Sequence, residues 1–318
     1  MIASEDALSS TSMRKHLSSL IPVLISAACL QAAQSAPPKF SGGRAFEDVR
    51  QLVAIGPRVA GTPGAQAARD YIRKQLQAAG VTVEEQPFEA ITPAGRVKMV
   101  NVRATLPAAG AASKQRLVIG GHYDTKLFKT FTFVGANDGG SSAAFLIELA
   151  RALKNRANRV PIELLFLDGE EAVGEWQGSD HTYGSRYYVE TAKKNGTLAD
   201  IRAFILVDMI GDRNLVIKRE ANSTPALVDA IWGAAKRLNR REFVAESTPI
   251  EDDHVEFLSA GVPSVDIIDL EYPDATYRFW HTQEDTLEHV AAASLQAVGD
   301  VLIAALPALE TASARAVP

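Results

Sequence analysis

The sequence predicts a single α/β domain, an α/β/α sandwich whose central sheet is mixed and mainly parallel, with helices on both faces. Two observations predict this fold. From residue 117 onward, strand-like apolar runs alternate with segments whose apolar residues recur at helical spacing. The runs LLFL (164–167) and FILV (204–207) are apolar at every position, which is typical of strands buried on both faces of a sheet.

The elements follow in chain order from these periodicities and from the glycine and proline residues that interrupt them. Helices are predicted over residues 44–55, 65–79, 141–153, 184–194, 225–238, 252–260 and 287–306. Strands are predicted over residues 81–88, 97–105, 117–121, 162–167, 204–207 and 264–268, with a further short strand near Val244. The Ala/Gly-rich stretch 107–113 is expected to form a loop.

The composition narrows the classes of function. The 318 residues carry a net charge of -5. This charge argues against a nucleic-acid binder, because recognition of phosphates needs a clustered basic surface. A single cysteine excludes an intramolecular disulfide and a zinc site built from cysteines. Catalytic or metal chemistry must therefore come from carboxylates and the six histidines.

The N-terminal segment has the layout of a secretory signal peptide. An apolar run over 17–30 follows Arg14 and Lys15 and precedes small residues, and it is too short to span a bilayer comfortably. The chain is accordingly divided into a signal peptide, a linker and a globular domain, at 1–35, 36–44 and 45–312. This division predicts an exported protein, periplasmic or secreted.

Two details of this segment stay open. Met13 directly precedes the charged pair and is an alternative start of the chain. Cys29 is an alternative site of lipid attachment, although Ser26 stands where such motifs prefer an aliphatic residue. If the signal is removed, the mature chain contains no cysteine.

Polar side chains gather where the predicted strands end. Those with catalytic or metal-binding chemistry, including one before the helix over 141–153 and one in a late loop, are His122, Asp138, Glu170, Glu171, Asp208 and His281. Because the carboxyl ends of parallel strands meet at one edge of a sheet, we expect them to converge. Taken singly, an aspartate before a helix commonly caps it, and a lone histidine is usually solvated. Together, two histidines and several carboxylates predict a zinc site with nitrogen and oxygen ligands.

Five motifs carry a resemblance to a known family. They are HYD (122–124), NDGG (137–140), DGEEA (168–172), VDMIG (207–211) and WHT (280–282). In this order they resemble the zinc aminopeptidases of peptidase family M28, and the resemblance covers residues 45–310. Within that family, residues 168–188 and 250–265 resemble glutaminyl cyclases of the animal type, with a tryptophan-bearing loop after the glutamate pair and an Asp-Asp-His run.

The resemblance implies a zinc-dependent glutaminyl-peptide cyclotransferase. Such an enzyme converts the N-terminal glutamine of a peptide or protein substrate into pyroglutamate and releases ammonia. One zinc ion would be held by Asp138, Glu171 and His281, with a fourth position open for water or substrate. That ion would polarise the side-chain carbonyl of the glutamine.

The resemblance also implies the roles of the other site residues. Glu170 would take the proton of the attacking α-amine and pass it to the leaving nitrogen. Asp208 and Asp252 would form a hydrogen-bonded acid network that shares a proton. The substrate-binding side chains would be Lys126, Trp176, Ile250, Glu251, Tyr272 and Trp280.

The sequence departs from the cyclases at two places. Glu251 stands where cyclases often have glutamine, so the polarity of that edge of the pocket differs. The segment 274–279 is longer than in the animal form, which leaves open whether Tyr272 or Phe279 lines the pocket.

Two other functions stay open at this stage. A two-zinc aminopeptidase would use His122 and Asp208 for a second metal ion, with Asp138 bridging the two. A non-catalytic peptide-binding module of the same fold would be expected to lack a ligand or the base, and all of these residues are present. No nucleic acid partner and no stable membrane span are expected; the oligomeric state is left open, with a monomer as the expectation.

Overall fold

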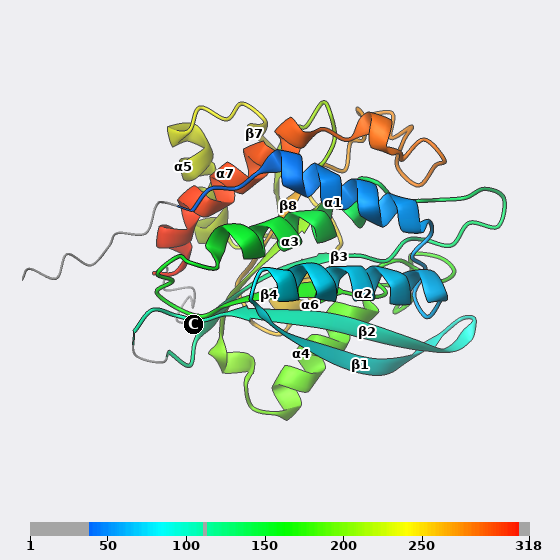
Figure 1. Cartoon of the computed structure of the whole chain (residues 1–318), viewed down its shortest axis with the longest axis horizontal. Coiled ribbons are helices and arrows are strands. Elements are labelled where there is room, and N and C mark those ends of the chain that lie inside the picture. The colour runs from blue at the N-terminus through cyan, green and yellow to red at the C-terminus, as the bar shows by residue number, and fades with distance from the viewer. Residues whose placement is uncertain (1–37, 111–112, 312–318) are drawn as a thin grey trace, which may run out of the picture. The chain divides into compact units, whose positions relative to one another are not determined.

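Six strands pair into one sheet, and the four in its parallel part are buried at nearly every position (Figure 1). The computed structural model describes residues 38–110 and 113–311, so the predicted signal peptide over 1–35 lies outside the described residues. The strands, in their order across the sheet, are β1 (Thr82–Thr92), β2 (Gly95–Leu106), β4 (Ile162–Leu167), β3 (Arg116–His122), β5 (Ile201–Asp208) and β8 (Ser264–Ile268). The last four pair in parallel, whereas β1, β2 and β4 pair antiparallel. The prediction of a mixed, mainly parallel sheet is confirmed.

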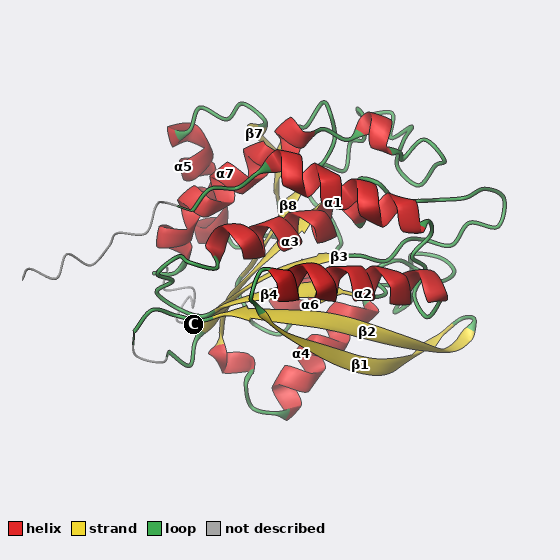
Figure 2. Ribbon diagram, viewed as in Figure 1, coloured by secondary structure: helices red, strands yellow, loops and turns green. Residues whose placement is uncertain are grey.

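Helices cover both faces of this sheet (Figure 2). Those in the larger apolar core are α1 (Gly42–Ile55), α2 (Pro63–Ala78), α3 (Gly140–Leu153), α5 (Pro225–Arg237) and α7 (Ala292–Leu309). Those in the smaller core on the opposite face are α4 (Tyr183–Lys194) and α6 (His254–Ser259). Because side chains alternate along a strand, Leu117 and Ile119 of β3 face the larger core while Val118 faces the smaller one.

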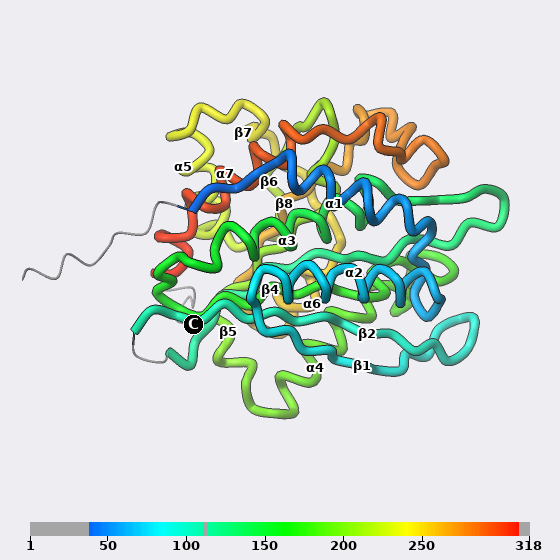
Figure 3. Tube along the Cα trace, viewed as in Figure 1, coloured from blue at the N-terminus to red at the C-terminus, as the bar shows by residue number. Residues whose placement is uncertain are grey.

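The two ends of the described chain pack against each other (Figure 3). Helix α1 lies beside α7, and the backbone N–H of Gly42 donates to Oε1 of Gln296 at 2.8 Å. Helix α7 is the one described helix that is long and apolar enough to span a membrane. Its apolar residues pack in the larger core, so we assign it to the interior of the domain.

One pair of strands differs from the prediction. A separate two-stranded sheet joins β6 (Ile217–Glu220) in parallel to β7 (Phe243–Thr248). The prediction contained β7 near Val244 but had no counterpart of β6. The reason is that β6 has the sequence IKRE, in which three of four residues are charged, so no apolar periodicity marks it.

The last predicted helix was placed too early. Residues Leu287–His289 form a short 3-10 turn (η2), and α7 begins only at Ala292. Between them the backbone is extended, because the N–H of Ala291 donates to the carbonyl of Gly211 at 2.9 Å. A second 3-10 turn, η1 (Leu198–Asp200), precedes β5.

The parallel strands bring their carboxyl ends to one edge of the sheet. His122 at the end of β3 pairs in register with Leu167 at the end of β4. Asp208 at the end of β5 pairs with Ile268 at the end of β8. The segments that follow these strands therefore start side by side, which is where ligands bind in sheets of this type.

We predict that the smaller core makes a large contribution to stability. Phe204 of β5 is fully buried, and its ring stacks on Phe257 of α6 with centroids 3.8 Å apart. Phe204→Ala should lower the free energy of unfolding by about 3 to 5 kcal/mol, because it leaves a cavity as well as removing apolar contact. The matched control is Ile91→Ala at a side chain that is 76% exposed, which should cost about 0.5 kcal/mol or less. Urea unfolding measures both, and equal losses would contradict the prediction.

Candidate active site

Three side chains form a group suited to a metal ion. Asp138 lies two residues before α3, Glu171 follows β4, and His281 comes from the loop before η2. The Nε2 atom of His281 lies 3.3 Å from Oδ2 of Asp138 and 3.3 Å from Oε2 of Glu171. Ligands at about 2.0 to 2.1 Å from a tetrahedral zinc ion are about 3.3 Å apart, so these separations match two edges of such a site.

The hydrogen bonding of this group also fits a metal ion. Oδ2 of Asp138 and Oε2 of Glu171 are buried, and apart from the ring of His281 they meet no donor in the described part of the chain. Buried oxygens are rarely left in that state without a water or an ion. His281 also has φ of 54°, a left-handed conformation that is uncommon outside glycine and is concentrated at functional sites.

Electrostatics in this group favour a bound cation. Burial lowers the pKa of His281, but the charges of Glu171 and Asp138 outweigh it and raise that pKa to about 10. Burial raises the pKa of Asp138, yet its contacts with His122 and His281 hold the value below the usual range. The pKa of Glu171 is raised by burial and by the charge of Asp138. A cation bound between Asp138 and Glu171 would therefore be stabilised by both carboxylates.

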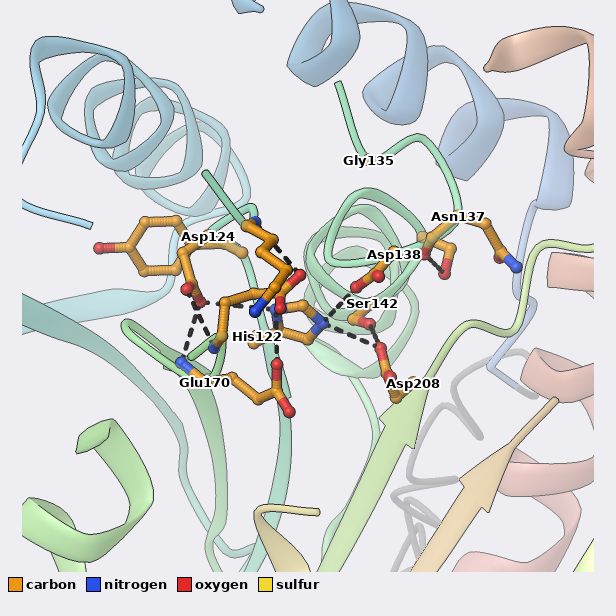
Figure 4. A network of polar contacts seen from close by, with 12 residues as sticks. His122, Asp124, Gly135, Asn137, Asp138, Ser142, Glu170 and Asp208 are labelled. Carbon is orange, nitrogen blue, oxygen red and sulfur yellow. Dashed lines mark hydrogen bonds and ion pairs between the residues drawn. The ribbon is translucent and has the colours of Figure 1, made fainter. Parts of the chain in front are cut away.

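A second group surrounds His122 (Figure 4). Its Nε2 atom lies 3.1 Å from Oδ1 of Asp208 and 3.2 Å from Oδ1 of Asp138. Its Nδ1 atom lies 3.4 Å from Asp124 and 3.8 Å from Glu170. Oδ1 of Asp208 is already partnered, since it also accepts a hydrogen bond from Ser142 at 3.0 Å, whereas Nδ1 of His122 has no hydrogen-bond partner in the described residues.

Three buried acids line the cavity beside the metal-binding group. Glu170, Asp208 and Asp252 are 7%, 6% and 4% exposed. Burial raises the pKa of Glu170 well above its usual value, and the nearby charge of His122 only partly opposes this. Burial and the charge of Asp208 raise the pKa of Asp252 well above its usual value. Acids of this kind can hold a proton at neutral pH and release it during a reaction.

Two further aspartates, which the sequence did not single out, hold the backbone of the candidate ligands. Oδ1 and Oδ2 of Asp124 accept hydrogen bonds from the N–H groups of Glu170 and Glu171 at 3.2 and 3.3 Å. Asp285 does the same for Asn137 and Asp138, at 2.8 and 3.0 Å. Asp124 lies inside the HYD motif, so the sequence offered a reason to include it in the site. Nothing in the sequence around Asp285 marks that residue.

Arg58 is another buried residue whose part in the site was not foreseen. Its guanidinium donates to the carbonyls of Tyr123, Val134 and Gly135 at 2.6 to 2.8 Å. It thereby ties both ends of the loop that leads from β3 to Asp138. Complete burial lowers the pKa of Arg58 to about 10, so the side chain remains charged at neutral pH.

The site opens into a cavity of about 410 Å³. Its walls include five of the six predicted substrate-binding side chains, namely Lys126, Trp176, Ile250, Glu251 and Trp280. Tyr272, the sixth, does not line this cavity: it is fully buried, and its hydroxyl donates to Asp285 at 3.1 Å. Phe279 does not line the cavity either, because its ring stacks on His289 with centroids 3.8 Å apart. Leu270 and Ile268 occupy that wall instead.

The tryptophan-bearing loop is built around Asp180. This buried carboxylate accepts hydrogen bonds from the consecutive N–H groups of residues 173–175 and from the hydroxyl of Tyr183. Trp176 then stacks on His181 with centroids 4.2 Å apart, and its indole N–H donates to Oε2 of Glu251 at 3.1 Å. The indole is therefore held on one face and at one edge.

Comparison with known proteins identifies the family. Residues 101–306 match peptidase family M28. The glutaminyl-peptide cyclotransferase of Bothrops jararaca is 30% identical, over 88% of this chain and 84% of its own length. The structure of a glutaminyl cyclase from an Acidobacteriales bacterium is 39% identical with a TM-score of 0.81, covering 87% of this chain and 97% of that one. A Zn-dependent exopeptidase from Parabacteroides distasonis is 26% identical with a TM-score of 0.75, covering 87% of this chain and 100% of that one. The chain thus belongs to peptidase family M28, in the branch of the glutaminyl-peptide cyclotransferases.

Proposed function

We propose that this protein is a zinc-dependent glutaminyl-peptide cyclotransferase, which converts the N-terminal glutamine of peptides or proteins into pyroglutamate and releases ammonia. The observation that carries the proposal is the pairing of a three-residue metal-binding group with buried acids of raised pKa, Glu170 and Asp252, in one cavity. The similarity to proteins named as glutaminyl cyclases supports the same function.

The proposed zinc ligands are Asp138, Glu171 and His281. A zinc ion held there supplies a Lewis acid that polarises the side-chain carbonyl of the substrate glutamine. We propose one ion per chain, because, of the two groups of metal-ligand type, this is the one whose facing carboxylate oxygens, Oδ2 of Asp138 and Oε2 of Glu171, have no hydrogen-bond partner in the described residues. The atoms around Nε2 of His122 satisfy each other by hydrogen bonding instead.

Glu170 is the proposed proton carrier. The α-amine nitrogen of the substrate forms a bond to the side-chain carbonyl carbon, and a proton must leave that nitrogen as the ring closes. The bond between that carbon and the amide nitrogen then breaks, and the departing nitrogen needs a proton to leave as ammonia. A single carboxyl with a raised pKa can accept the first proton and deliver it to the second nitrogen.

Asp208 and Asp252 are the proposed acid network around the reacting amide. Both line the cavity, and burial together with the charge of Asp208 raises the pKa of Asp252. A protonated Asp252 can donate a hydrogen bond to the substrate while Asp208 accepts one from His122. This arrangement orients the amide without placing two full negative charges against it.

The tryptophans are proposed to hold the substrate in its reactive conformation. Trp176 and Trp280 lie on the cavity wall, and the ring of Trp280 stacks on His281 with centroids 4.4 Å apart. Flat walls limit the conformations of the glutamine side chain, so the amine and the amide carbon meet more often. Lys126, Ile250 and Glu251 would complete the contacts with the substrate.

We also propose export of the protein with loss of residues 1–35, which leaves the globular domain over 45–312. The charged, apolar and small-residue pattern of the N-terminal segment supports this proposal. N-terminal sequencing of the protein recovered from the exporting cells should begin at Ala36, and an N-terminus at Met1 or Met13 would contradict it.

A two-zinc aminopeptidase is the second candidate. The specific observation in its favour is that His122, Asp138 and Asp208 also form a group of metal-ligand type. The similarity to a protein named as a Zn-dependent exopeptidase is consistent with it.

Paired substrates separate these two functions. Incubation with glutaminyl-2-naphthylamide should yield the pyroglutamyl product and ammonia, because the amine and the amide are in one molecule. Leucine p-nitroanilide, which has no side-chain amide, should remain intact. Release of nitroaniline without ring closure would contradict the cyclotransferase and support the aminopeptidase.

Removal of the proton carrier should abolish turnover without loss of metal. Glu170→Gln keeps the size of the side chain but cannot carry a proton, so kcat should fall by about 100-fold or more. Zinc content by metal analysis should stay at the wild-type value. Glu190→Gln, at an exposed position on α4, is the matched control and should keep full activity. Retained activity in Glu170→Gln would remove Glu170 from this role.

Metal analysis tests the ligand set. The wild-type protein should contain one zinc ion per chain, and His281→Ala should lose it because a site with two carboxylates alone binds zinc weakly. His289→Ala replaces a nearby histidine outside both groups and should retain the ion. Two zinc ions per chain, with one lost in His122→Ala, would instead support the aminopeptidase.

A further inference from the structure

Asp252 reaches the cavity from a segment of irregular backbone. Strand β7 ends at Thr248 and α6 begins at His254, so residues 249–253 belong to neither. The sequence predicted that the helix would include Asp252, but the structure starts it two residues later. A side chain in irregular backbone is held in place only as well as its neighbours are anchored.

The last residues of this segment are anchored to α4. The hydroxyl of Ser185 donates to Oδ1 of Asp253 at 2.5 Å. The N–H of Asp253 in turn donates to Oδ1 of Asp252 at 2.5 Å. Asp253 is fully buried, so this contact ties the backbone rather than the substrate.

A single carboxylate holds both ends of the segment. Oε1 of Glu220, the last residue of β6, accepts a hydrogen bond from the N–H of Ile250 at 3.1 Å. Oε2 of Glu220 lies 3.1 Å from Nε2 of His254, the first residue of α6. Asp252 lies midway between these two anchor points in the chain. The residues of the Asp-Asp-His run therefore differ in their surroundings. Asp252 faces the cavity, whereas Asp253 and His254 face the protein interior.

The carboxylate of Glu220 is ionised in this contact. Glu220 is 2% exposed and His254 is fully buried. Burial by itself raises the pKa of Glu220, but hydrogen bonds from His254 and from the N–H groups of Asn222 and Ile250 outweigh it and lower the pKa to about 2. An ionised carboxylate only accepts hydrogen bonds, so Nε2 of His254 must carry the hydrogen.

Asp266 of β8 lies on the other side of His254. Its Oδ2 atom is 3.7 Å from Nδ1 of His254, and neither of its oxygens has a hydrogen-bond partner in the described residues. Burial and the charge of Asp252 raise the pKa of Asp266 well above its usual value. The anchor of His254 is therefore Glu220, at hydrogen-bonding distance, rather than Asp266.

We propose that Glu220 and His254 are positioning residues that hold Asp252 at the cavity wall. Neither side chain lines the cavity, so both act through Asp252 and not on the substrate. The pair fixes the backbone on both sides of Asp252, and thereby its direction relative to Glu170 and Asp208. This inference rests on the proposed cyclotransferase function.

The test separates kcat from KM. His254→Ala removes the anchor at the start of α6, so kcat for a glutaminyl peptide should fall about tenfold while KM changes less than twofold, because Asp252 is misplaced but the pocket wall is kept. Zinc should remain at one ion per chain. His254→Gln retains an N–H donor for Glu220 and should recover most of the lost kcat. Glu220→Gln should lower kcat to the same extent as His254→Ala.

Glu163→Gln is the matched control for the loss of a buried carboxylate. Glu163 on β4 is 1% exposed and accepts hydrogen bonds from Arg103 and Arg116, but it does not border the cavity. Its substitution should lower Tm and leave kcat unchanged at 25 °C. The proposal would be overturned if the kcat of His254→Ala were unchanged. It would also be overturned if the loss of activity only matched a loss of zinc or of folded protein. If Glu220→Gln does not fold, the two His254 variants decide. A wild-type protein that fails to cyclise glutaminyl peptides would refute the proposed function itself.

Discussion

The site depends on keeping several carboxylates buried together at one edge of the sheet. The buried carboxylates that face the cavity are each 7% exposed or less, and they are Asp138, Glu170, Glu171, Asp208 and Asp252. Buried negative charges so close together repel each other and lose their hydration, so they need positive charge or protons. The imidazole of His122, whose pKa is raised, supplies part of this positive charge, and raised pKa values keep protons on Glu170 and Asp252. The proposed zinc ion, with a neutral His281 among its ligands, would supply the rest. The burial that destabilises the ionised forms of these carboxylates also allows Glu170 and Asp252 to hold a proton and to transfer it.

Residues that do not touch the cavity hold this cluster in place. Asp124 and Asp285 each bind two consecutive backbone N–H groups, and one of each pair belongs to a proposed zinc ligand. Arg58 binds carbonyls at both ends of the loop before Asp138. Glu220 binds both ends of the segment that carries Asp252. In each case a buried ionisable side chain replaces the hydrogen bonds that a helix or strand would have provided.

The features that the sequence left open or did not mark share a physical cause. Tyr272 and Phe279 are both aromatic residues in a long loop, and nothing local distinguishes a ring that lines a cavity from one that packs behind it. Tyr272 is buried because its hydroxyl binds Asp285, which lies 13 residues away in the chain. Strand β6 and the late start of α7 likewise depend on pairing with distant backbone, at β7 and at Gly211. Contacts of this kind leave no periodicity in the segment itself.

The sequence by itself determined the sheet and the identity of the converging residues. Runs such as LLFL require burial on both faces, and parallel strands bring their ends together, so His122, Glu171 and Asp208 had to meet at one edge. The tertiary structure alone decided which oxygens lack partners, which aromatic rings face the cavity and which charged residues support the site. The reason is that alternation of apolar residues is a local property of the chain, whereas hydrogen-bond partners and burial are set by segments that meet only when the chain folds.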